Sequence, residues 1–463
     1  MKRGDILELN IESLAFGGRG IGRMDGYVIF VPGAVPGDRV RIRLKKKKSS
    51  YGEGQLLEIV QPAPERIDAP CRHFGTCGGC KWQNLPYALQ LTYKKQHVAE
   101  LINRVGGMCD VPVHDPIPCE QQYRYRNKME FSFSGKGWLT PEELQNPDMV
   151  KSFALGFHLP GRHDRILNID ECLLMSEQLN QVLEFSRDWF RESGIPVYDD
   201  RKKAGQLRFL VLRESVSDES VMVNLVSHAD LSDQLAPYVD EMTGRFPFVQ
   251  SVFNTVNDRI AQVATGDKRI LLHGTPVIRE TIGGYVFEIS PDAFFQTNSR
   301  QARVLYDVVK SYVGQVQGTL WDLYCGTGTI GIYLSGQVGF VRGFEIVDNA
   351  VSDAHRNAEA NGVANCSFVV GDLRNRIRDY LADRPEIIVC DPPRAGMHPS
   401  VVQAIREAAP PTVVYVSCDP ATMSRDLAAL SADYRVDEVQ PVDMFPHTFH
   451  IESVARLTRT AGR

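Results

Sequence analysis

The strongest constraint on the fold lies after residue 316, where short apolar segments alternate regularly with segments of helical character. The apolar segments are, in order, TLWDLY, FVRGFE, CSFVVGD, EIIVCD and TVVYVSC. This alternation is typical of βαβ units and predicts a parallel, doubly wound sheet. The last two segments, YRVDEVQPVDMF and HIESVARLTR, have no helix between them and predict a closing antiparallel pair. We therefore predict an α/β domain over residues 284–463.

The first sixty residues differ in composition from the rest of the chain. Turn signals at Asp25-Gly26 and Pro36-Gly37-Asp38 separate short strand-like segments, among them RVRIRL with its period-two alternation. Several short strands in so few residues predict a small, OB-like β-barrel over residues 1–62. Eleven Lys and Arg against seven Asp and Glu give these sixty residues a net charge of +4, although the whole chain carries −5. A basic module joined to an acidic body favours a polyanionic partner. The run Lys45 to Lys48 is interpreted either as a solvated loop or as a loop that faces RNA.

Residues 63–283 mix strand-like and helix-like segments without a clear period and predict a mixed α+β central domain. No apolar run of the chain reaches the length of a membrane span. The N-terminus, MKRGDILELNIES, carries charges throughout and lacks the apolar core of a signal peptide. Ten cysteines in an intracellular chain of 463 residues do not resemble a disulfide framework. We therefore expect a cytoplasmic protein without a membrane partner, whose cysteines are metal ligands, catalytic groups or core residues.

A glycine-rich turn follows the first strand of the predicted sheet. The segment YCGTGTIG contains Gly326, Gly328 and Gly331, and Glu345 ends the next strand 19 positions after Gly326. Glycines let the backbone turn tightly beside a ligand, and an acid at that distance accepts hydrogen bonds from ribose hydroxyls. This pattern fits NAD and S-adenosylmethionine equally well.

Two further acids distinguish between these ligands. Asp372 follows the third strand, where it can accept from an adenine amino group, and Asp391 follows the fourth strand in the motif DPPR. Open α/β sheets bind ligands at the carboxyl ends of their strands, where each of these acids is expected. A helix N-cap is the plain alternative for any one of them. The glycine-rich turn and the three acids Glu345, Asp372 and Asp391 make four positions in order after successive strands, and together they favour the binding of a methyl donor.

Cys418 ends the fifth strand and is followed at once by Asp419-Pro420. A lone cysteine is more often a small core residue than a nucleophile. A thiolate, however, can add to C6 of uracil and turn C5 into a nucleophile toward a methyl sulfonium, after which a base must remove the C5 proton. Glu452, in FHIESV on the last strand, is a candidate base, and an inward position would raise its pKa. Its alternative is a solvent-facing strand residue.

The motifs CGTGTIG, DPPR, VSCDPATMSRDL and HIESVARL, in this order, resemble the RNA uracil-5-methyltransferase family, and SPDAFFQTN resembles the family segment that leads into a Rossmann-like methyltransferase domain. The resemblance implies Cys418 as nucleophile, Glu452 as base, and transfer of a methyl group from S-adenosylmethionine to C5 of a uridine. It implies a donor site formed by Gln296, Tyr324, Thr329, Glu345, Asp372 and Asp391. Phe294 or Phe295 would stack on the flipped base unless both belong to the core.

A cysteine cluster with the spacing Cys71-x5-Cys77-x2-Cys80 lies at the start of the central domain. Soft thiolates this close suit zinc or an iron–sulfur cluster, and Cys172 in NIDECLL offers a fourth ligand. A subgroup of the resembled family has this spacing, carries a [4Fe–4S] cluster and begins with a TRAM domain, which FGGRGIGR and VPGAVPGDRV resemble. This RumA-type subgroup methylates 23S ribosomal RNA, so the resemblance implies that target, the cluster and a monomeric enzyme.

Other interpretations stay open. The same chemistry on transfer RNA is the nearest, because relatives with the cluster act on transfer RNA. A non-catalytic RNA-binding or ribosome assembly factor leaves Cys418 and Glu452 without a purpose. An NAD-dependent oxidoreductase fits the glycines but leaves DPPR unexplained. Finally, YRYRNKMEFS (123–132) interleaves aromatic and basic residues, which suits single-stranded RNA or, equally, an edge strand with a charged face.

Overall fold

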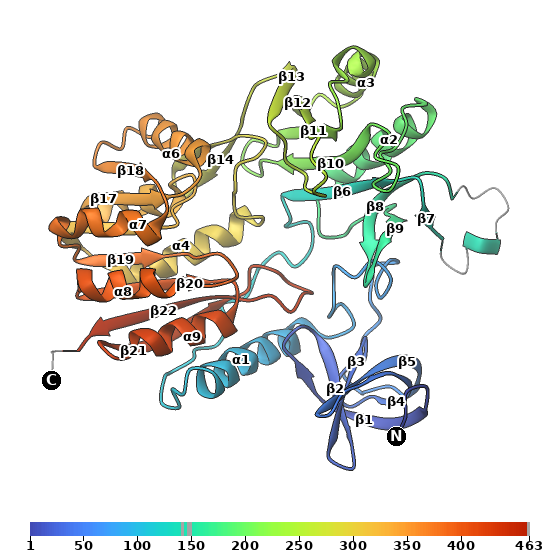
Figure 1. Cartoon of the computed structure of the whole chain (residues 1–463), viewed down its shortest axis with the longest axis horizontal. Helices are drawn as coiled ribbons and strands as arrows, with labels where there is room; N and C mark the ends of the chain where they lie inside the picture. The colour runs from blue at the N-terminus through green and yellow to red at the C-terminus, as the bar shows by residue number, and fades with distance from the viewer. Residues whose placement is uncertain (140–142, 146–150, 461–463) are drawn as a thin grey trace. The chain divides into compact units, whose positions relative to one another are not determined.

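The computed structural model describes residues 1–139, 143–145 and 151–460, and the chain divides into two compact units (Figure 1). The first unit comprises Met1–Gln122, Ser311–Val313 and Ile387–Arg463; the second comprises Tyr123–Lys310 and Gly314–Glu386. This grouping follows other boundaries than the predicted domains 1–62, 63–283 and 284–463, which stay predictions. Within the described residues, no helix combines the length and the apolar character needed to cross a bilayer.

The N-terminal residues of the first unit form a closed five-stranded barrel, drawn in blue in Figure 1. Its strands are β1 (Ile6–Ala15), β2 (Arg19–Met24), β3 (Tyr27–Pro32), β4 (Arg39–Lys47) and β5 (Tyr51–Gln61), in the order β1-β2-β3-β5-β4. In β4 the side chains of Val40, Ile42 and Leu44 are buried in the barrel core, whereas Arg39 and Arg43 are exposed. The predicted barrel and the alternation in RVRIRL are therefore confirmed.

The lysine run of the barrel lies mostly in a strand. Lys45, Lys46 and Lys47 are exposed residues at the end of β4, and Lys48 follows them. The antiparallel ladder continues through this run, since Lys46 pairs with Glu53 of β5 both in register and by an ion pair of 3.1 Å. The prediction of a loop was wrong because cross-strand pairing with β5 extends the strand past its last apolar residue.

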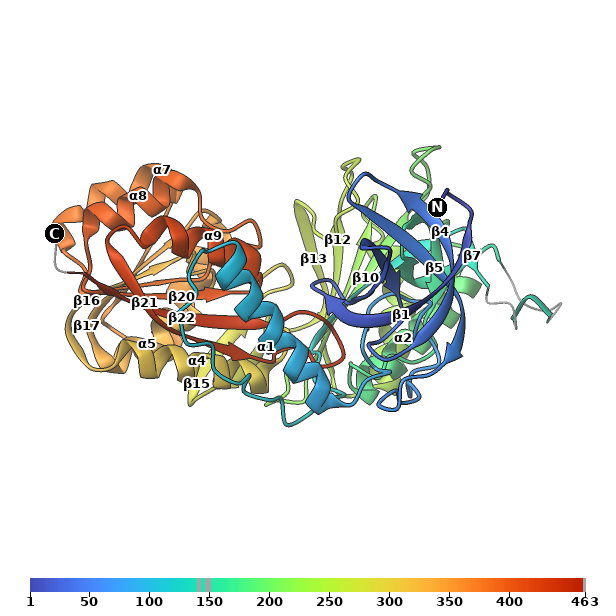
Figure 2. The ribbon, with the colours of Figure 1, turned by 90° about the horizontal axis from the view of Figure 1, so that it is seen from below.

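Helices and strands also make up the rest of the first unit. The helices are α1 (Tyr87–Arg104), α8 (Pro399–Ala408) and α9 (Pro420–Leu430), and the strands are β19 (Ile387–Cys390), β20 (Thr412–Ser417), β21 (Tyr434–Val442) and β22 (Glu452–Arg459). Strand β19 is parallel to β20, whereas β22 is antiparallel to both β20 and β21. The predicted closing antiparallel pair is thus confirmed. Helix α1 packs against α9 (Figure 2).

The second unit contains an eight-stranded sheet in the order β13-β12-β11-β10-β6-β8-β9-β7. These strands are β6 (Lys128–Ser134), β7 (Gly137–Trp138), β8 (Ala154–Leu159), β9 (Arg162–Asn168), β10 (Leu207–Glu214), β11 (Val221–Ser227), β12 (Val249–Val256) and β13 (Lys268–Gly274). Helices α2 (Glu177–Glu192) and α3 (Ser232–Arg245) pack against β10 and β12 respectively. Both faces of β10 and β11 are buried, which explains why this region shows no clear period in its sequence.

The same unit holds a run of parallel strands with intervening helices. It follows the hairpin of β14 (Ile278–Ile282) and β15 (Tyr285–Ile289) and helix α4 (Ser299–Val313), whose last three residues belong to the first unit. The run consists of β16 (Val316–Leu323), α5 (Thr329–Leu334), β17 (Val338–Glu345), α6 (Asp348–Ala360), β18 (Cys366–Val370) and α7 (Leu373–Arg376). Short 3₁₀ helices lie at Glu143–Gln145, between β7 and β8, and at Ser335–Gln337 and Ile377–Asp383. Strand β17 is parallel to both β16 and β18. The predicted parallel βαβ pattern is therefore confirmed.

Candidate active site

Cys418 lies where β20 gives way to α9. The next residue, Asp419, caps that helix by accepting a hydrogen bond from the backbone N–H of Ala421 at 2.9 Å, and Pro420 occupies the first helical position. Strand β20 pairs with β22 so that Ser417 faces Ser453. Cys418 and Glu452 thus directly adjoin the last residue pair of the two strands, and the charge of Glu452 acts on the Cys418 thiol.

Asp391 lies at the same edge as this pair. It follows β19, which runs parallel to β20 with Cys390 in register with Tyr415, so both strands present their carboxyl ends on one side. Glu452 begins β22 and is only 4% exposed. The structure thus brings three of the predicted residues of the first unit together: a thiol and two carboxyl groups.

Burial raises the pKa of all three groups, and neighbouring negative charge raises the pKa of Cys418 and Glu452 further. Burial, followed by the negative charges of Glu452 and Asp391, raises the pKa of Cys418 to about 12. Burial and the charge of Asp391 raise the pKa of Glu452 to about 8, as predicted for an inward glutamate. Burial alone raises the pKa of Asp391 to about 6. At neutral pH the thiol and the Glu452 carboxyl therefore hold their protons, and a pKa near 8 suits a group that must exchange a proton under those conditions.

Arg394 belongs to this site, although sequence reasoning gave it no role. Its guanidinium hydrogen-bonds the Cys418 side chain and lowers the pKa of both Cys418 and Glu452. A positive charge beside a thiol favours the thiolate, which is the reactive form of cysteine. The signal was present in the sequence, because Arg394 is the last residue of DPPR.

The glycine-rich turn of the second unit runs from the end of β16 into α5. Tyr324, Gly326 and Gly328 all have left-handed backbones, with φ of 64°, 54° and 78°. A Cβ on Gly328 would approach the Phe368 ring to 2.8 Å, so both conformation and space require glycine there. At Gly326 nothing lies within 4 Å of a Cβ position, which leaves this backbone accessible to a ligand.

Glu345 and Asp372 lie at the carboxyl ends of β17 and β18, as predicted, but each also has a local structural role. The Glu345 carboxylate accepts hydrogen bonds from the backbone N–H of Gly326 (3.2 Å), Ile346 (2.8 Å) and Val347 (2.9 Å). Asp372 is the N-cap of α7 and pairs with Arg374. The capping alternative considered for the acids is therefore observed at Asp372, and ligand binding by both residues stays a prediction.

The remaining predicted donor residues also lie in the second unit. Thr329 is the first residue of α5 and accepts a hydrogen bond from the Tyr306 hydroxyl at 3.2 Å. Gln296 is buried, and its backbone carbonyl accepts from the Asn127 side chain at 3.0 Å. The two phenylalanines beside it differ: Phe295 is buried, whereas Phe294 is 69% exposed. Phe294 is therefore the one available for stacking on a base.

The cysteine segment, residues 71–80, belongs to the first unit. The Cys77 sulfur accepts the backbone N–H of Gly79 at 3.3 Å. Burial raises the pKa of Cys77, and the charge of Cys71 raises it further, so these two thiols are close enough to interact electrostatically. Cys172 lies in the second unit, where its backbone N–H donates to Asn180. Across the described part of the chain, no group of three or more His, Cys, Asp or Glu side chains is arranged to hold a metal ion.

Part of the aromatic and basic segment 123–132 packs within the second unit. Tyr125 is buried, and Arg124 donates to the backbone carbonyls of Cys172 (3.1 Å) and Met175 (3.0 Å). Strand β6, which contains the second half of the segment, lies between β10 and β8 in the interior of its sheet. The alternative of an edge strand was therefore wrong, and the buried Tyr125 is not available for stacking. RNA contact by the partly exposed Tyr123, Arg126 and Lys128 stays a prediction.

Comparison with known proteins gives consistent results. The tRNA (Uracil-5-)-methyltransferase family matches residues 201–460, and the TRAM domain matches residues 1–57. An uncharacterized RNA methyltransferase from Porphyromonas gingivalis is 40% identical over 464 residues, covering 97% of this chain and 99% of the relative. A second, from Chlorobaculum tepidum, is 39% identical over 469 residues, covering 99% and 97%.

Among solved structures, the chain is similar to the Pyrococcus abyssi tRNA (uracil-54, C5)-methyltransferase in complex with S-adenosyl-L-homocysteine. The TM-score is 0.74 at 30% sequence identity, and the match covers 98% of this chain and 100% of that one. The family match spans more than half of the chain and contains Cys418, Glu452 and the glycine-rich turn. The chain belongs to the tRNA (uracil-5-)-methyltransferase family of S-adenosylmethionine-dependent RNA methyltransferases, with a TRAM domain at its N-terminus.

Proposed function

We propose that this enzyme methylates C5 of a uridine in structured RNA through a covalent bond between Cys418 and C6 of the base. The observation that supports the proposal is that Cys418 and the buried Glu452 adjoin the same end of the β20–β22 pair, where the charge of Glu452 acts on the thiol. A nucleophile and a base on one strand pair are the two groups that the reaction needs. A core cysteine would not need an ionisable partner whose burial is costly.

In the proposed reaction S-adenosylmethionine supplies an electrophilic methyl group, and the side chains handle the rest. The Cys418 thiol loses its proton to solvent, Arg394 favours the resulting thiolate, and the sulfur forms a bond to C6 of the uracil. The electrons of the C5–C6 double bond then become available at C5, which takes the methyl group. Glu452 must first release its own proton to solvent, and the ionised carboxylate then removes the C5 proton. The double bond re-forms as the Cys418 thiolate leaves, and the thiolate takes up a proton from solvent. The balance is one methyl group gained by the base and one proton released.

For the donor we propose a site made of Gln296, Tyr324, Thr329, Glu345, Asp372 and Asp391. The left-handed turn through Gly326 and Gly328 supports this, because open space lies beside Gly326 at the carboxyl ends of parallel strands. Glu345 and Asp372 flank the same edge of the strands β16 to β18. The solved relative was crystallised with S-adenosyl-L-homocysteine, the product of methyl donation.

As the RNA target we propose 23S ribosomal RNA, with transfer RNA as the second candidate. The TRAM domain and the cysteine spacing support the first. The solved relative, named for uracil 54 of transfer RNA and similar over 98% of this chain, supports the second. The exposed Lys45, Lys47 and Arg43 of the barrel would contact RNA phosphates.

Loss of the gene is expected to remove 5-methyluridine from 23S ribosomal RNA in the source organism. Nucleoside mass spectrometry of separated ribosomal and transfer RNA from a deletion strain measures this. Complementation with the Cys418→Ala form is the control and should not restore the modification. Loss of the nucleoside from transfer RNA alone would assign the second target. Unchanged 5-methyluridine in both RNAs would contradict the proposed function.

We further propose that Cys71, Cys77, Cys80 and Cys172 hold a [4Fe–4S] cluster. Four soft thiolates suit such a cluster, and the N–H groups of Gly79 and Cys80 that hydrogen-bond Cys77 would stabilise a negatively charged sulfur. The cluster would be held by these four sulfurs, and no step of the methyl transfer is assigned to it.

Protein purified without oxygen is expected to be brown and to contain about four iron atoms per chain, as one [4Fe–4S] cluster requires. Iron and sulfide analysis with electronic absorption measures this. Cys80→Ser should lose most of the iron, whereas Cys109→Ser, at an exposed cysteine outside the cysteine segment, should keep it. Stoichiometric zinc after reconstitution with iron and sulfide would contradict the cluster and leave the methyltransferase assignment unchanged.

A further inference from the structure

The connection between β21 and β22 carries Glu452 at its end. It runs from Asp443 to Ile451, and the residues that flank it, Val442 and Glu452, are paired in the strand register. Irregular connections usually lie at the surface, where water satisfies the backbone. This one is largely buried, with Asp443, Met444 and His447 all less than 5% exposed. Its polar groups must therefore be satisfied by protein partners.

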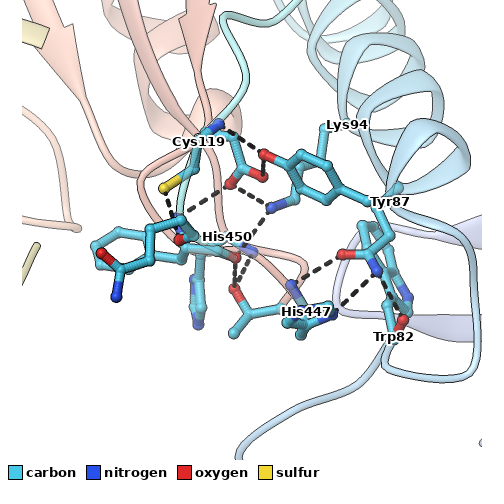
Figure 3. A network of polar contacts seen from close by, with 11 residues as sticks. Trp82, Tyr87, Lys94, Cys119, His447 and His450 are labelled. Carbon is cyan, nitrogen blue, oxygen red and sulfur yellow. Dashed lines mark hydrogen bonds and ion pairs between the residues drawn. The ribbon is translucent and has the colours of Figure 1, made fainter. Parts of the chain in front are cut away.

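Helix α1 supplies a charged partner to the start of the connection (Figure 3). The Lys94 ammonium donates to Asp443 Oδ1 at 2.6 Å and to the backbone carbonyl of Phe445 at 3.0 Å. The Tyr87 hydroxyl donates to Asp443 Oδ2 at 2.9 Å. Lys94 and Asp443 are both completely buried. Because Asp443 directly follows Val442, these bonds fix the strand end that faces Glu452.

A second set of bonds holds the middle of the connection. The His447 backbone N–H donates to Gln90 Oε1 at 2.8 Å, and Gln90 Nε2 lies 3.2 Å from His447 Nδ1. The His447 carbonyl accepts from the backbone N–H groups of Lys81 and Trp82. His447 has a left-handed backbone with φ of 66°, which a residue with a side chain adopts only where its surroundings impose it. Gln90 and Lys94, the two side chains of α1 that bond the connection, are thus one helical turn apart.

Stability alone does not explain these residues. A buried ion pair adds little to the free energy of unfolding compared with apolar side chains of similar size. The free energy needed to remove both charges from water is about as large as the free energy of their attraction. Such a pair does fix geometry, since alternative positions of the connection would leave a buried charge unpaired. The geometry fixed here is that of the strand end opposite Glu452.

We propose that Lys94, acting through Asp443, is a positioning residue for Glu452 and that Gln90 supports it through His447. The inference rests on the proposed function, in which Glu452 removes the C5 proton from the covalent intermediate. Loosening the connection should slow that step specifically. It should leave the formation of the Cys418–C6 bond almost unchanged, because Cys418 is carried by β20 and α9 and not by the connection.

The test is a single-turnover comparison of adduct formation and adduct resolution with a uridine-containing RNA substrate. Lys94→Met keeps the length of the side chain and removes its charge. We expect it to slow resolution about 10- to 100-fold, the range that a misplacement of about 1 Å produces, with adduct formation within about threefold of wild type. The covalent protein–RNA adduct should therefore accumulate. Lys95→Met, at the exposed neighbouring position that pairs with Asp115, is the matched control and should behave like wild type.

Two further variants cover the case in which Lys94→Met fails to fold. The double variant Lys94→Met, Asp443→Asn removes both charges while keeping an acceptor for Tyr87. Tyr87→Phe removes one hydrogen bond to Asp443 and should slow resolution by a smaller factor. If the folded variants lose adduct formation and resolution in parallel, the role is merely structural and the inference is overturned. If Glu452→Gln itself traps no adduct, the proposed function fails instead.

Discussion

Cys418→Ala is expected to abolish methyl transfer, by at least about a thousandfold, while S-adenosylmethionine binds with nearly unchanged affinity. The thiol is the only group proposed to bond to C6, and the loss of a nucleophile removes that path entirely. Among the proposed donor residues, Gln296 precedes α4, Tyr324 and Thr329 lie at the glycine-rich turn, and Glu345 and Asp372 lie at the ends of β17 and β18. All five are far from β20 in the chain. Transfer of labelled methyl to RNA and calorimetric titration of the donor measure the two effects.

Loss of folding would give the same activity result, so stability needs its own measurement. The substitution removes one sulfur atom from a half-buried strand end, which we expect to cost about 1 kcal/mol of unfolding free energy. Urea unfolding checks this. Cys109→Ala, at an exposed cysteine, is the matched control and should retain full activity. Wild-type activity in Cys418→Ala would contradict the proposed mechanism.

Glu452→Gln is expected to trap the enzyme on its substrate. Glutamine has nearly the shape of glutamate but does not accept the C5 proton, so bond formation and methylation proceed and release does not. A protein–RNA adduct should accumulate that survives denaturing electrophoresis. It should form only with RNA that contains the target uridine. The double variant Cys418→Ala, Glu452→Gln should form none, because the bond to the base is made by the sulfur.

The same Glu452→Gln variant should be more stable than wild type at neutral and higher pH. Folding raises the pKa of Glu452 from its ordinary 4.5 to about 8, so the folded state holds the proton more tightly than the unfolded state. Stability linked to this proton is complete below pH 4.5 and is lost as the pH rises toward 8. The difference in unfolding free energy between Glu452→Gln and wild type should be small below pH 4.5. Between pH 4.5 and about 8 it should grow by at most about 1.4 kcal/mol per pH unit. Urea unfolding at several pH values measures it, and a pH-independent difference would contradict the raised pKa.

The sequence predicted the strand pattern and its carboxyl-end residues well because both depend on local order. Strands β16 to β20 occur in the predicted order along the chain. Asp391 directly follows β19, and Cys418 directly follows β20. The raised pKa of Glu452 was predicted for the case in which this strand residue faces inward, and its burial confirms that case. The sequence alone left the outward orientation equally open. The sequence did not allow a choice between helix capping and ligand binding at Asp372, because both roles use the same position after a strand.

Other features depend on contacts that no local pattern records. Lys94 and Asp443 are 349 positions apart in the chain, and Lys94 looks like one more surface lysine of an amphipathic helix. Phe294 and Phe295 are adjacent and chemically identical, yet only Phe295 is buried. The aromatic and basic character of Arg124 and Tyr125 suggested RNA contact. The sequence does not show that Arg124 bonds the carbonyls of Cys172 and Met175 or that Tyr125 is buried. Residues of this kind become assignable only when the fold is known.

The most direct test of the central claim is the chemical identity of the adduct in Glu452→Gln. The variant is incubated with RNA from the deletion strain and S-adenosylmethionine that carries a CD3 group, and the product is digested with protease and nuclease. Mass spectrometry should find the peptide that contains Cys418 bound to a uridine nucleotide with one CD3 group and with the C5 hydrogen still present. A methylated uridine with no bond to protein, or a nucleotide bound to another residue, would contradict the account.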